Sequence, residues 1–340
     1  MNNLFERLLI LRSPKIGPAT YNNLLARFGS VDAVLASLNP STELRDSVLR
    51  EMDAAEKLGV HFIADSDDFY PQQLRCVKNH PPIITVRGNI ETLKRESVAM
   101  VGTRHATATG MNFMADMAYE FAKHAIPVVS GMAMGTDSAA HRGALRANGN
   151  TNTIAVLAGG VDYIWPVENE RLYHEILERG VIVSEMPIGF MPVGSNFVQR
   201  NRIIAGICSK LIVGEADSQS GSMKTAGFAH EYGRKIYAIP SHPADSRAVG
   251  PNSLIRSRVA ILCQGVQDFF KDAIPDKKTE KKFESENILL DNIGTVPVSE
   301  SVLAEIVGKN ISEIKRDLVV LELQGLIQKN DSGYVRTILK

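Results

Sequence analysis

The sequence predicts an α/β protein in which a parallel sheet is preceded by a helical domain and followed by a small domain of helices and a hairpin. Short apolar runs alternate with amphipathic helical stretches from about residue 61 to residue 270. Before that region apolar side chains recur at helical spacing, and after it the chain becomes dense in lysine and acid. Continuous apolar strands that alternate with helices are typical of a parallel sheet covered by helices on both faces.

The 340 residues exceed what one hydrophobic core usually holds, so we expect two or three domains. We predict an N-terminal helical domain (1–60), an alternating α/β domain (61–270), a solvated linker (271–286) and a C-terminal domain (287–340). The linker is expected because charged residues without apolar neighbours cannot bury a core.

The first 60 residues are expected to be helical because leucines recur on periodic faces. The turn between the first two helices contains the pair Gly17–Pro18, with Lys15 as its positive charge. Two interpretations stay open. The turn belongs either to a helix-hairpin-helix module whose exposed amides bind a phosphate, or to a helical bundle whose turn needs glycine.

Six apolar runs of the alternating region are predicted to be strands, at 97–101, 126–129, 153–158, 181–183, 210–214 and 235–239. In open α/β sheets, ligands bind outside the carboxyl ends of the strands. Glycines and hydroxyl side chains follow several of these runs, where the first amides of the next helix lack partners and attract anions. We therefore expect a phosphate- or nucleic-acid-binding surface at this edge of the sheet.

The first junction, Gly102-Thr103-Arg104, ends a strand and places an arginine where ligands bind. A guanidinium group is suited to phosphate recognition. We therefore favour a phosphate clamp at this junction over a structural turn with a surface arginine.

The second junction combines Gly131 and Gly135 with Asp137 and His141. Its glycine spacing matches neither the dinucleotide fingerprint nor a P-loop, and no acid ends the next strand, so NAD and FAD enzymes are disfavoured. Asp137 and His141 share a helix face. They form either an acid–base pair or, in the interpretation that we favour, a helix cap and a packed histidine.

Two further segments supply candidate anion ligands. Arg200, Asn201 and Arg202 are predicted at a loop-to-helix transition, where one arginine binds an anion and the other holds a carboxylate. The second segment opens a helix with hydroxyls, free amides and a lysine, and these form an anion nest: Ser220, Gly221, Ser222, Lys224 and Thr225. Glu215, at a strand end, is either catalytic or, in the interpretation that we favour, holds an arginine such as Arg202.

Bulk charge gives no support to nucleic-acid binding, because 38 lysines and arginines balance 38 acids. Three windows without acids nevertheless hold arginines and would form one positive pocket if they converge: 97–115, 186–214 and 246–267. The alternative is chance spacing of surface charge. For Tyr163 and Trp165, base stacking at the same site and a core role both stay open.

Three scattered cysteines, Cys76, Cys208 and Cys263, fit a reducing cytosol and are predicted to be buried apolar side chains. Their spacing indicates no metal site, and no motif predicts a cofactor. No apolar stretch is long enough to span a bilayer, and the first residues do not resemble a signal peptide. We therefore predict a cytoplasmic protein without a membrane partner.

The last domain is predicted to be a winged helix, because helices precede two short strands joined by an Asp-Ser-Gly turn. The helix before these strands, at 311–323, carries two basic and three acidic residues. Its charge does not suit duplex DNA, so we expect a protein-contact role instead.

The motifs together resemble the DNA-processing protein A (DprA/Smf) family, through Val101–Arg104, Ser130–Asp137, Ala140–Leu145, Arg200–Gly206 and Ser220–Ala226. The resemblance covers most of 61–262 and extends more loosely to both flanks. It implies an extended Rossmann-like fold with an N-terminal domain like a SAM or helix-hairpin-helix domain and a C-terminal winged helix. The sequence departs from the family at Met134, where arginine is usual, and at Thr136, where isoleucine is usual.

The resemblance also implies a function. It indicates a non-enzymatic homodimer that binds and protects incoming single-stranded DNA and helps to load RecA recombinase in natural transformation. The DNA contacts that it implies come from Arg104, the Gly131–Asp137 loop, Arg200, Arg202 and the Ser220–Thr225 nest. A phosphoribohydrolase or a nucleotide sensor is the alternative that the fold class leaves open.

Overall fold

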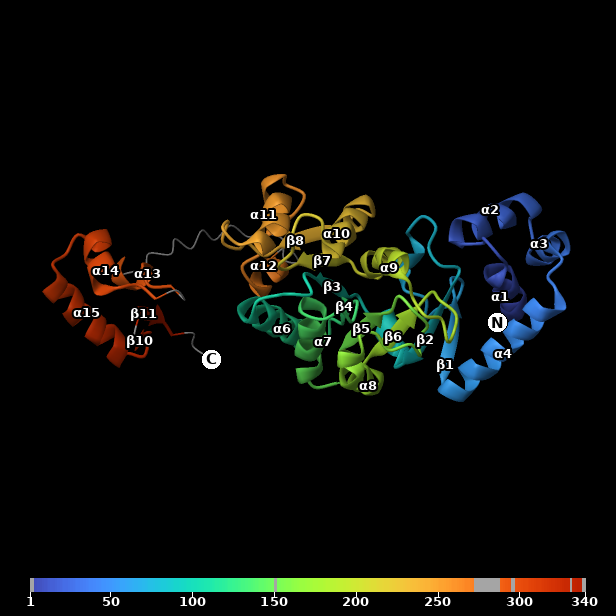
Figure 1. Cartoon of the computed structure of the whole chain (residues 1–340), viewed down its shortest axis with the longest axis horizontal. Coiled ribbons are helices and arrows are strands. Elements are labelled where there is room, and N and C mark those ends of the chain that lie inside the picture. Colours follow the sequence, from blue (N-terminus) through green and yellow to red (C-terminus); the bar gives the residue numbers. More distant parts are fainter. Residues whose placement is uncertain (1–2, 150–151, 272–287, 295–296, 331, 338–340) are drawn as a thin grey trace. The chain divides into compact units, whose positions relative to one another are not determined.

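The computed structural model describes residues 3–149, 152–271, 288–294, 297–330 and 332–337. The chain divides into two compact units, Met1–Pro275 and Asp276–Lys340 (Figure 1). The predicted linker lies outside the described residues, except for Lys271, which ends a helix.

Helices make up the described part of the N-terminal domain, as the leucine periodicity predicts. They are α1 (Leu4–Arg12), α2 (Pro18–Phe28), α3 (Val31–Leu38) and α4 (Thr42–Leu58). The hydroxyls of Ser30 and Ser41 cap α3 and α4 by accepting hydrogen bonds from the third amide of each helix. Gly17, before α2, has φ −102° and open space around it, so this turn does not need glycine.

Among the described residues, nine strands form one sheet in the order β1-β2-β6-β5-β4-β3-β7-β8-β9. Their bounds are β1 (Val60–Ala64), β2 (Ile83–Gly88), β3 (Val98–Val101), β4 (Val128–Ser130), β5 (Thr153–Val156), β6 (Val181–Ser184), β7 (Lys210–Val213), β8 (Lys235–Ala238) and β9 (Ile261–Leu262). The strands from β6 to β9 in this order are parallel, and they include all six apolar runs. The order reverses between β3 and β7, which is where α/β sheets bind ligands.

The sheet is mixed at its other edge, where β2 pairs antiparallel with both β1 and β6. The prediction of a parallel sheet is therefore wrong for the edge formed by β1 and β2. The sequence hides β1 because it begins two residues after α4 ends, so its apolar side chains continue the helical periodicity.

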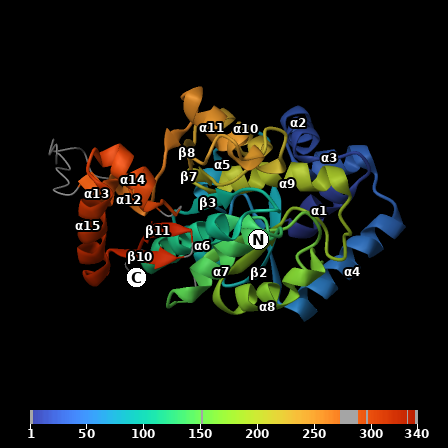
Figure 2. The same cartoon turned by 60° about the vertical axis from the view of Figure 1, so that its left-hand side comes forward.

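Helices cover both faces of the sheet (Figures 1 and 2). One face carries α6 (Ala108–Lys123), α7 (Thr136–Arg146), α8 (Glu170–Arg179) and α12 (Val266–Lys271); the other carries α5 (Gln72–Arg75), α9 (Gly194–Ile207), α10 (Gly221–Glu231) and α11 (Val249–Arg256). Short 3₁₀ segments lie at Ile90–Lys94, Val167–Asn169 and Ser246–Ala248. Val98 and Met100 of β3 pack in the cluster with α6, whereas Ala99 and Val101 pack in the cluster with α9. This alternation is what a strand buried on both faces requires.

The second unit has its own hydrophobic core. Its elements are α13 (Ile288–Asp291), α14 (Glu300–Val307), α15 (Ile311–Leu323), β10 (Ile327–Asn330) and β11 (Gly333–Arg336). The two strands pair antiparallel, and Val298 forms a further bridge to Tyr334. Helices thus precede a hairpin as predicted, and the assignment to the winged-helix class stays a prediction.

Cysteine burial agrees with the sequence in part. Cys208 and Cys263 are buried, but Cys76 is exposed at the end of the short helix α5, so the prediction is wrong there. Within the ranges that the structure describes, no helix combines the length and the apolar character needed to cross a membrane.

His141 of α7 lies in the protein interior. Its Nδ1 is 2.7 Å from Thr153 Oγ1, and that hydroxyl donates to the carbonyl of Val128 at 2.8 Å. The imidazole Nδ1–H therefore donates to the hydroxyl. Burial, with help from Arg200 and Arg142, lowers the pKa of His141 to about 3, so the ring is neutral. The interpretation of His141 as a packed histidine is confirmed.

We expect Gly143→Ala to destabilise the protein, because a Cβ at this position of α7 would lie 2.1 Å from the carbonyl oxygen of Ala115 in α6. Overpacking of this kind costs about 1–3 kcal/mol. Gly227→Ala in α10 is the matched control, since a Cβ there meets open space and should be neutral or stabilise by about 0.5–1 kcal/mol. Urea unfolding measures both variants, and equal midpoints would contradict this packing.

The neutral, buried His141 predicts a pH-dependent stability. Because its pKa is lower in the folded chain than the ordinary 6.5, the unfolded chain binds the extra proton, and the free energy of unfolding falls as the pH drops below about 6.5 toward 3. One such group contributes at most about 1.4 kcal/mol per pH unit. His141→Leu should flatten this slope in urea unfolding between pH 6.5 and 5. The exposed His61→Leu should keep it, and identical slopes for the two variants would disprove the assignment.

Candidate nucleic-acid interface

A pocket of about 550 Å³ lies at the carboxyl end of β3, where the strand order reverses. The loop after β3, the start of α7, Trp165, one side of α9 from Gly194 to Ile204 and the start of α10 line it. All but three of the predicted site residues meet there: Gly102, Thr103, Arg104, Asp137, Arg200, Asn201, Ser220, Gly221, Ser222, Lys224 and Thr225. Gly131, Gly135 and Arg202 do not line this pocket.

Gly102 and Gly135 let the loop after β3 pack against the start of α7. A Cβ at Gly102 would lie 2.4 Å from Thr136 Oγ1, and a Cβ at Gly135 would lie 2.5 Å from the carbonyl oxygen of Thr103. Gly135 also has φ +75°, which residues with side chains rarely adopt. The amide and the hydroxyl of Thr136 both donate to the Thr103 carbonyl at 3.1 Å. These contacts fix the loop that carries Arg104.

The carboxylate of Asp137 accepts hydrogen bonds from backbone amides that the sequence predicts to bind an anion. It accepts hydrogen bonds from the amides of Gly131 at 3.2 Å and Ala133 at 3.4 Å. Burial raises the pKa of Asp137, and the nearby Arg200 guanidinium and these amides oppose that rise. For these two amides the prediction of phosphate binding is wrong, because a side chain of the same chain satisfies them. Asp137 binds this loop instead of capping its helix.

Arg200 is buried beneath the pocket. Its Nη1 donates to the carbonyl of Gly131 at 2.7 Å and to the carbonyl of Val156, and its Nε lies 3.3 Å from Asn201 Oδ1. Burial lowers the pKa of Arg200 to about 10. Since α9 begins at Gly194, Arg200 lies in the middle of a helix, and the predicted loop-to-helix transition at this position is wrong.

Two opposite buried charges meet at Gly131. A Cβ there would lie 2.6 Å from Arg200 Nη2 and 2.9 Å from Asp137 Oδ2. Glycine is needed at this position because those two side chains fill the space that any larger residue would take. Gly131 therefore belongs to the support of the pocket rather than to its surface.

Arg202 lies away from the pocket, although only Asn201 separates it from Arg200. Both oxygens of Glu185 accept hydrogen bonds from Arg202 Nη2. Glu215, which we expected to hold this arginine, instead accepts from the amide and hydroxyl of Thr107 at 2.7 and 2.5 Å. The prediction that one arginine of the pair holds a carboxylate is confirmed, but Glu215 is the wrong carboxylate.

Arg104 and two aromatic rings form one wall of the pocket. The exposed Arg104 guanidinium lies 4.9 Å from the ring centre of Trp165 and 5.9 Å from that of Phe197, and the two rings lie 4.4 Å apart. Both rings are half-buried. The structure thus places Trp165 at the site, whereas Tyr163 lines a smaller hollow beside it.

The start of α10 forms another part of the lining. The Ser220 hydroxyl caps the helix by accepting from the amide of Met223, and it lies 2.8 Å from the hydroxyl of Ser222. The first amides of a helix have no carbonyl partner within it and attract anions. Lys224 is exposed in this turn. Hydroxyls, amides and an ammonium group are therefore close together, as predicted.

The acid-free windows converge in part. Arg104 and Arg200 reach the pocket, and Arg247 of the third window donates to the carbonyl of His105 at 3.3 Å while it pairs with Asp245. Lys210 lies instead over the Phe269 ring. The positive character of the pocket therefore comes from a few side chains.

His105, Phe197 and Asp217 also line the pocket and are absent from the predicted set. His105 directly follows Arg104, so its place in the first junction is a signal from which the sequence could predict it as a lining residue. The sequence offers no such signal for Asp217, because a carboxylate repels phosphate and does not fit a phosphate-binding motif. Among the described residues, no three His, Cys, Asp or Glu side chains gather as metal ligands would.

Comparisons with known proteins agree with the motifs. Residues 61–273 match the family described as DNA recombination-mediator protein A, and residues 2–57 match the DprA-like N-terminal HHH domain. The second match supports the helix-hairpin-helix interpretation of the first helices.

Protein Smf of Escherichia coli K12 is 32% identical over 307 residues, which cover 86% of this chain and 81% of that protein. The X-ray structure of DNA processing protein A from Streptococcus pneumoniae aligns with a TM-score of 0.67 at 29% identity, over 80% of this chain and 99% of that one. A structure of DNA processing protein A from Helicobacter pylori, described for its single-stranded DNA binding mode, aligns with a TM-score of 0.57 at 28% identity, over 63% and 95%. The chain belongs to the DNA recombination-mediator protein A (DprA/Smf) family.

Proposed function

We propose that this protein binds single-stranded DNA in the pocket at the carboxyl end of β3, and that it acts in DNA processing by binding rather than by catalysis. The main observation behind this proposal is that two exposed cations, Arg104 and Lys224, line one pocket. The start of α10 and two aromatic rings line the same pocket. The Helicobacter pylori relative, described for its single-stranded DNA binding mode, supports the proposal.

The chemistry of the lining suits an unpaired strand. Cations and helix N-termini bind phosphates, and aromatic rings stack on bases of any sequence. In a duplex the base faces are already stacked, so Trp165 and Phe197 offer less to it. The balanced formal charge also provides no excess of cations for a long phosphate backbone. We therefore propose that the affinity for single strands exceeds the affinity for duplex DNA.

The partners are also proposals. A homodimer through the α/β domain is supported by the edge strand β9, where Ile261 and Leu262 are more than 40% exposed. Protection of incoming DNA, loading of RecA recombinase in natural transformation and a cytoplasmic location rest on the family resemblance. On α15, the exposed Val319, Val320 and Leu323 support the proposal that the C-terminal unit contacts a protein.

The enzyme alternative has less support. Of the residues that would do acid–base work, His141 is buried away from the pocket, the Asp137 carboxylate is bonded to two amides, and Glu215 is bonded to Thr107. These contacts give the enzyme alternative little support. Incubation with nucleoside monophosphates tests this alternative, since released base would favour it. A thermal-shift comparison of nucleotides with oligonucleotides tests the sensor alternative.

Arg104→Ala should weaken binding to a labelled oligo(dT) about tenfold, because it removes a phosphate-neutralising charge and one partner of the aromatic wall. The slope of log affinity against log salt should become shallower by about 0.7. Fluorescence anisotropy over a salt titration measures both quantities.

The control is Arg171→Ala, which removes an equally charged side chain from the surface of α8, where Arg171 is 92% exposed and pairs with Glu175. It should leave affinity and slope unchanged. If Arg104→Ala and Arg171→Ala behave alike, Arg104 is not a DNA ligand.

Leu262→Glu should shift the protein toward monomer in sedimentation velocity, because a carboxylate in an apolar edge contact is costly to desolvate. Val302→Glu, an equally exposed apolar position on α14, is the control and should keep the oligomeric state of the unsubstituted chain. A dimer that survives Leu262→Glu would rule out this edge as the interface.

A further inference from the structure

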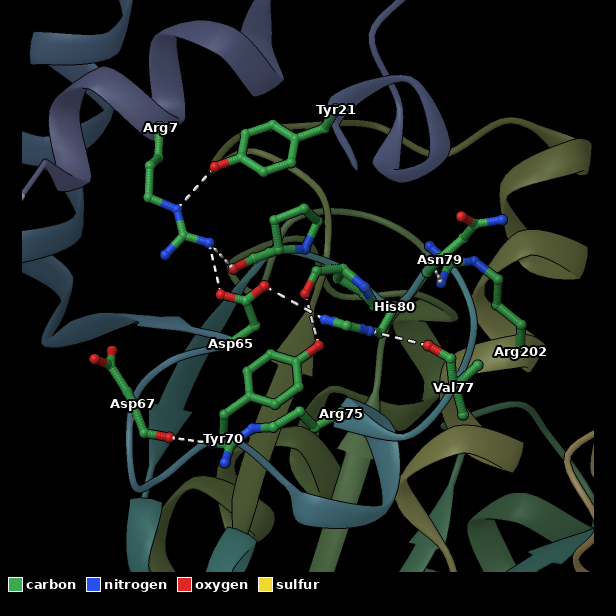
Figure 3. A network of polar contacts seen from close by, with 12 residues as sticks. Arg7, Tyr21, Asp65, Asp67, Tyr70, Arg75, Val77, Asn79, His80 and Arg202 are labelled. Carbon is green, nitrogen blue, oxygen red and sulfur yellow. Dashed lines mark hydrogen bonds and ion pairs between the residues drawn. The ribbon is translucent and has the colours of Figure 1, made fainter. Parts of the chain in front are cut away.

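A loop between the N-terminal helices and α9 has carbonyl groups that accept hydrogen bonds from several parts of the chain. We call residues 77–82 the connector loop. Its accepting carbonyls are those of Val77, Asn79, Pro81 and Pro82, and their donors are His80, Arg202, Tyr70 and Arg7 respectively (Figure 3). The loop is therefore bonded to α1 of the N-terminal domain through one arginine and to α9 through another.

The N-terminal side of this network is centred on Asp65. Arg7 Nη2 lies 2.7 Å from Asp65 Oδ1 and 3.1 Å from the carbonyl oxygen of Pro82, while Arg7 Nε donates to Tyr21 Oη at 2.9 Å. His80 Nε2 lies 3.4 Å from Asp65 Oδ2 (Figure 3). The Arg7 side chain is only 14% exposed, so it is committed to this contact. Two helices of the N-terminal domain are thus fixed to the connector loop.

The α9 side of the network depends on Arg202. Its Nη1 lies 3.4 Å from the carbonyl oxygen of Asn79, and its Nη2 holds both oxygens of Glu185. The Arg202 side chain is 14% exposed, and both of its terminal nitrogens face protein acceptors. On the same helix, Phe197 and Arg200 reach the pocket. Arg202 therefore fixes the helix that supplies part of the pocket lining.

We propose that Arg202 is a positioning residue, and that the N-terminal domain strengthens DNA binding by holding α9 through the connector loop. The inference rests on the proposed binding of single-stranded DNA in the pocket. It assigns the second arginine of the Arg-Asn-Arg motif to the scaffold rather than to the phosphates. It also gives the N-terminal domain an effect on the pocket that requires no contact between that domain and the strand.

The effect should be partial, because α9 has a second support near its end. Arg234 donates to the carbonyls of Ala205 and Gly206, and a Cβ at Gly206 would lie 2.6 Å from Leu74. Loss of Arg202 therefore loosens the middle of α9 while its C-terminal end stays held. We expect the variant to keep the fold, with the lining residues of α9 held less precisely in the pocket.

The first test separates a positioning residue from a phosphate ligand. Arg202→Met should weaken oligo(dT) binding about tenfold and leave the salt slope unchanged, because no phosphate contact is lost. Arg202→Lys, which keeps a cation beside Glu185, should recover part of the affinity. Arg171→Met removes an exposed arginine of another ion pair and should change neither quantity. A shallower slope in Arg202→Met, like that expected for Arg104→Ala, would overturn the proposal.

The second test concerns the N-terminal domain. Arg7→Met should weaken binding with an unchanged slope, and the double variant Arg7→Met/Arg202→Met should lose less than the product of the two single losses, since both act through the connector loop. Full affinity in a folded Arg7→Met protein, or strictly multiplicative losses, would refute the coupling.

Thermal unfolding identifies any variant that fails to fold. In that case Tyr21→Phe, which removes only the hydroxyl that Arg7 contacts, replaces Arg7→Met, and Glu185→Gln replaces Arg202→Met, with the same expectations on a smaller scale. If the unsubstituted chain does not bind the oligonucleotide, the proposed function fails. If it binds and these variants bind equally well, this inference alone fails.

Discussion

The pocket depends on one buried guanidinium group. Arg200 extends from α9 to carbonyls that follow β4 and end β5, and Asp137 places an opposite charge beside it across Gly131. Removing one member of a buried charged pair leaves the other without compensation, which makes such pairs difficult to alter singly. The positions of the neighbouring strands, α7 and α9 therefore depend on each other at this point, and the rest of the pocket is built around it.

This constraint divides the polar residues of the site into two groups. The buried group consists of Asp137, Arg200 and Asn201, whose amide joins α9 to the carbonyl of Gly221 in α10 at 3.1 Å. The exposed group, Arg104 and Lys224, has charges that a ligand can reach. Buried groups determine the shape of the pocket, whereas exposed cations neutralise phosphate. Within the Arg-Asn-Arg motif, Arg200 is bonded beneath the pocket whereas Arg202 pairs with Glu185, because nearby positions on a helix point in different directions.

The sequence predicts the parallel strands and the edge at which the ligand pocket lies, because apolar runs and glycine-bearing junctions depend on local rules. It does not predict β1, which continues the pattern of α4, or the antiparallel edge, which depends on long-range pairing. Partners of charged side chains are equally non-local. Arg202 pairs with Glu185 rather than Glu215, and the amides near Gly131 are bonded to Asp137 rather than left for an anion. Only the folded chain decides between an arginine that binds a ligand and one that binds a carbonyl.

The central claim is that an unpaired strand lies against the rim formed by Arg104, Trp165, Phe197 and the start of α10. Photo-crosslinking of the full chain to oligo(dT), followed by mass spectrometry of the crosslinked peptides, locates the strand most directly. We expect crosslinks at Trp165 and Phe197 and in residues 101–105 and 217–225, with little signal for a duplex of the same length. Crosslinks confined to the opposite edge of the sheet or to the C-terminal unit would contradict the account.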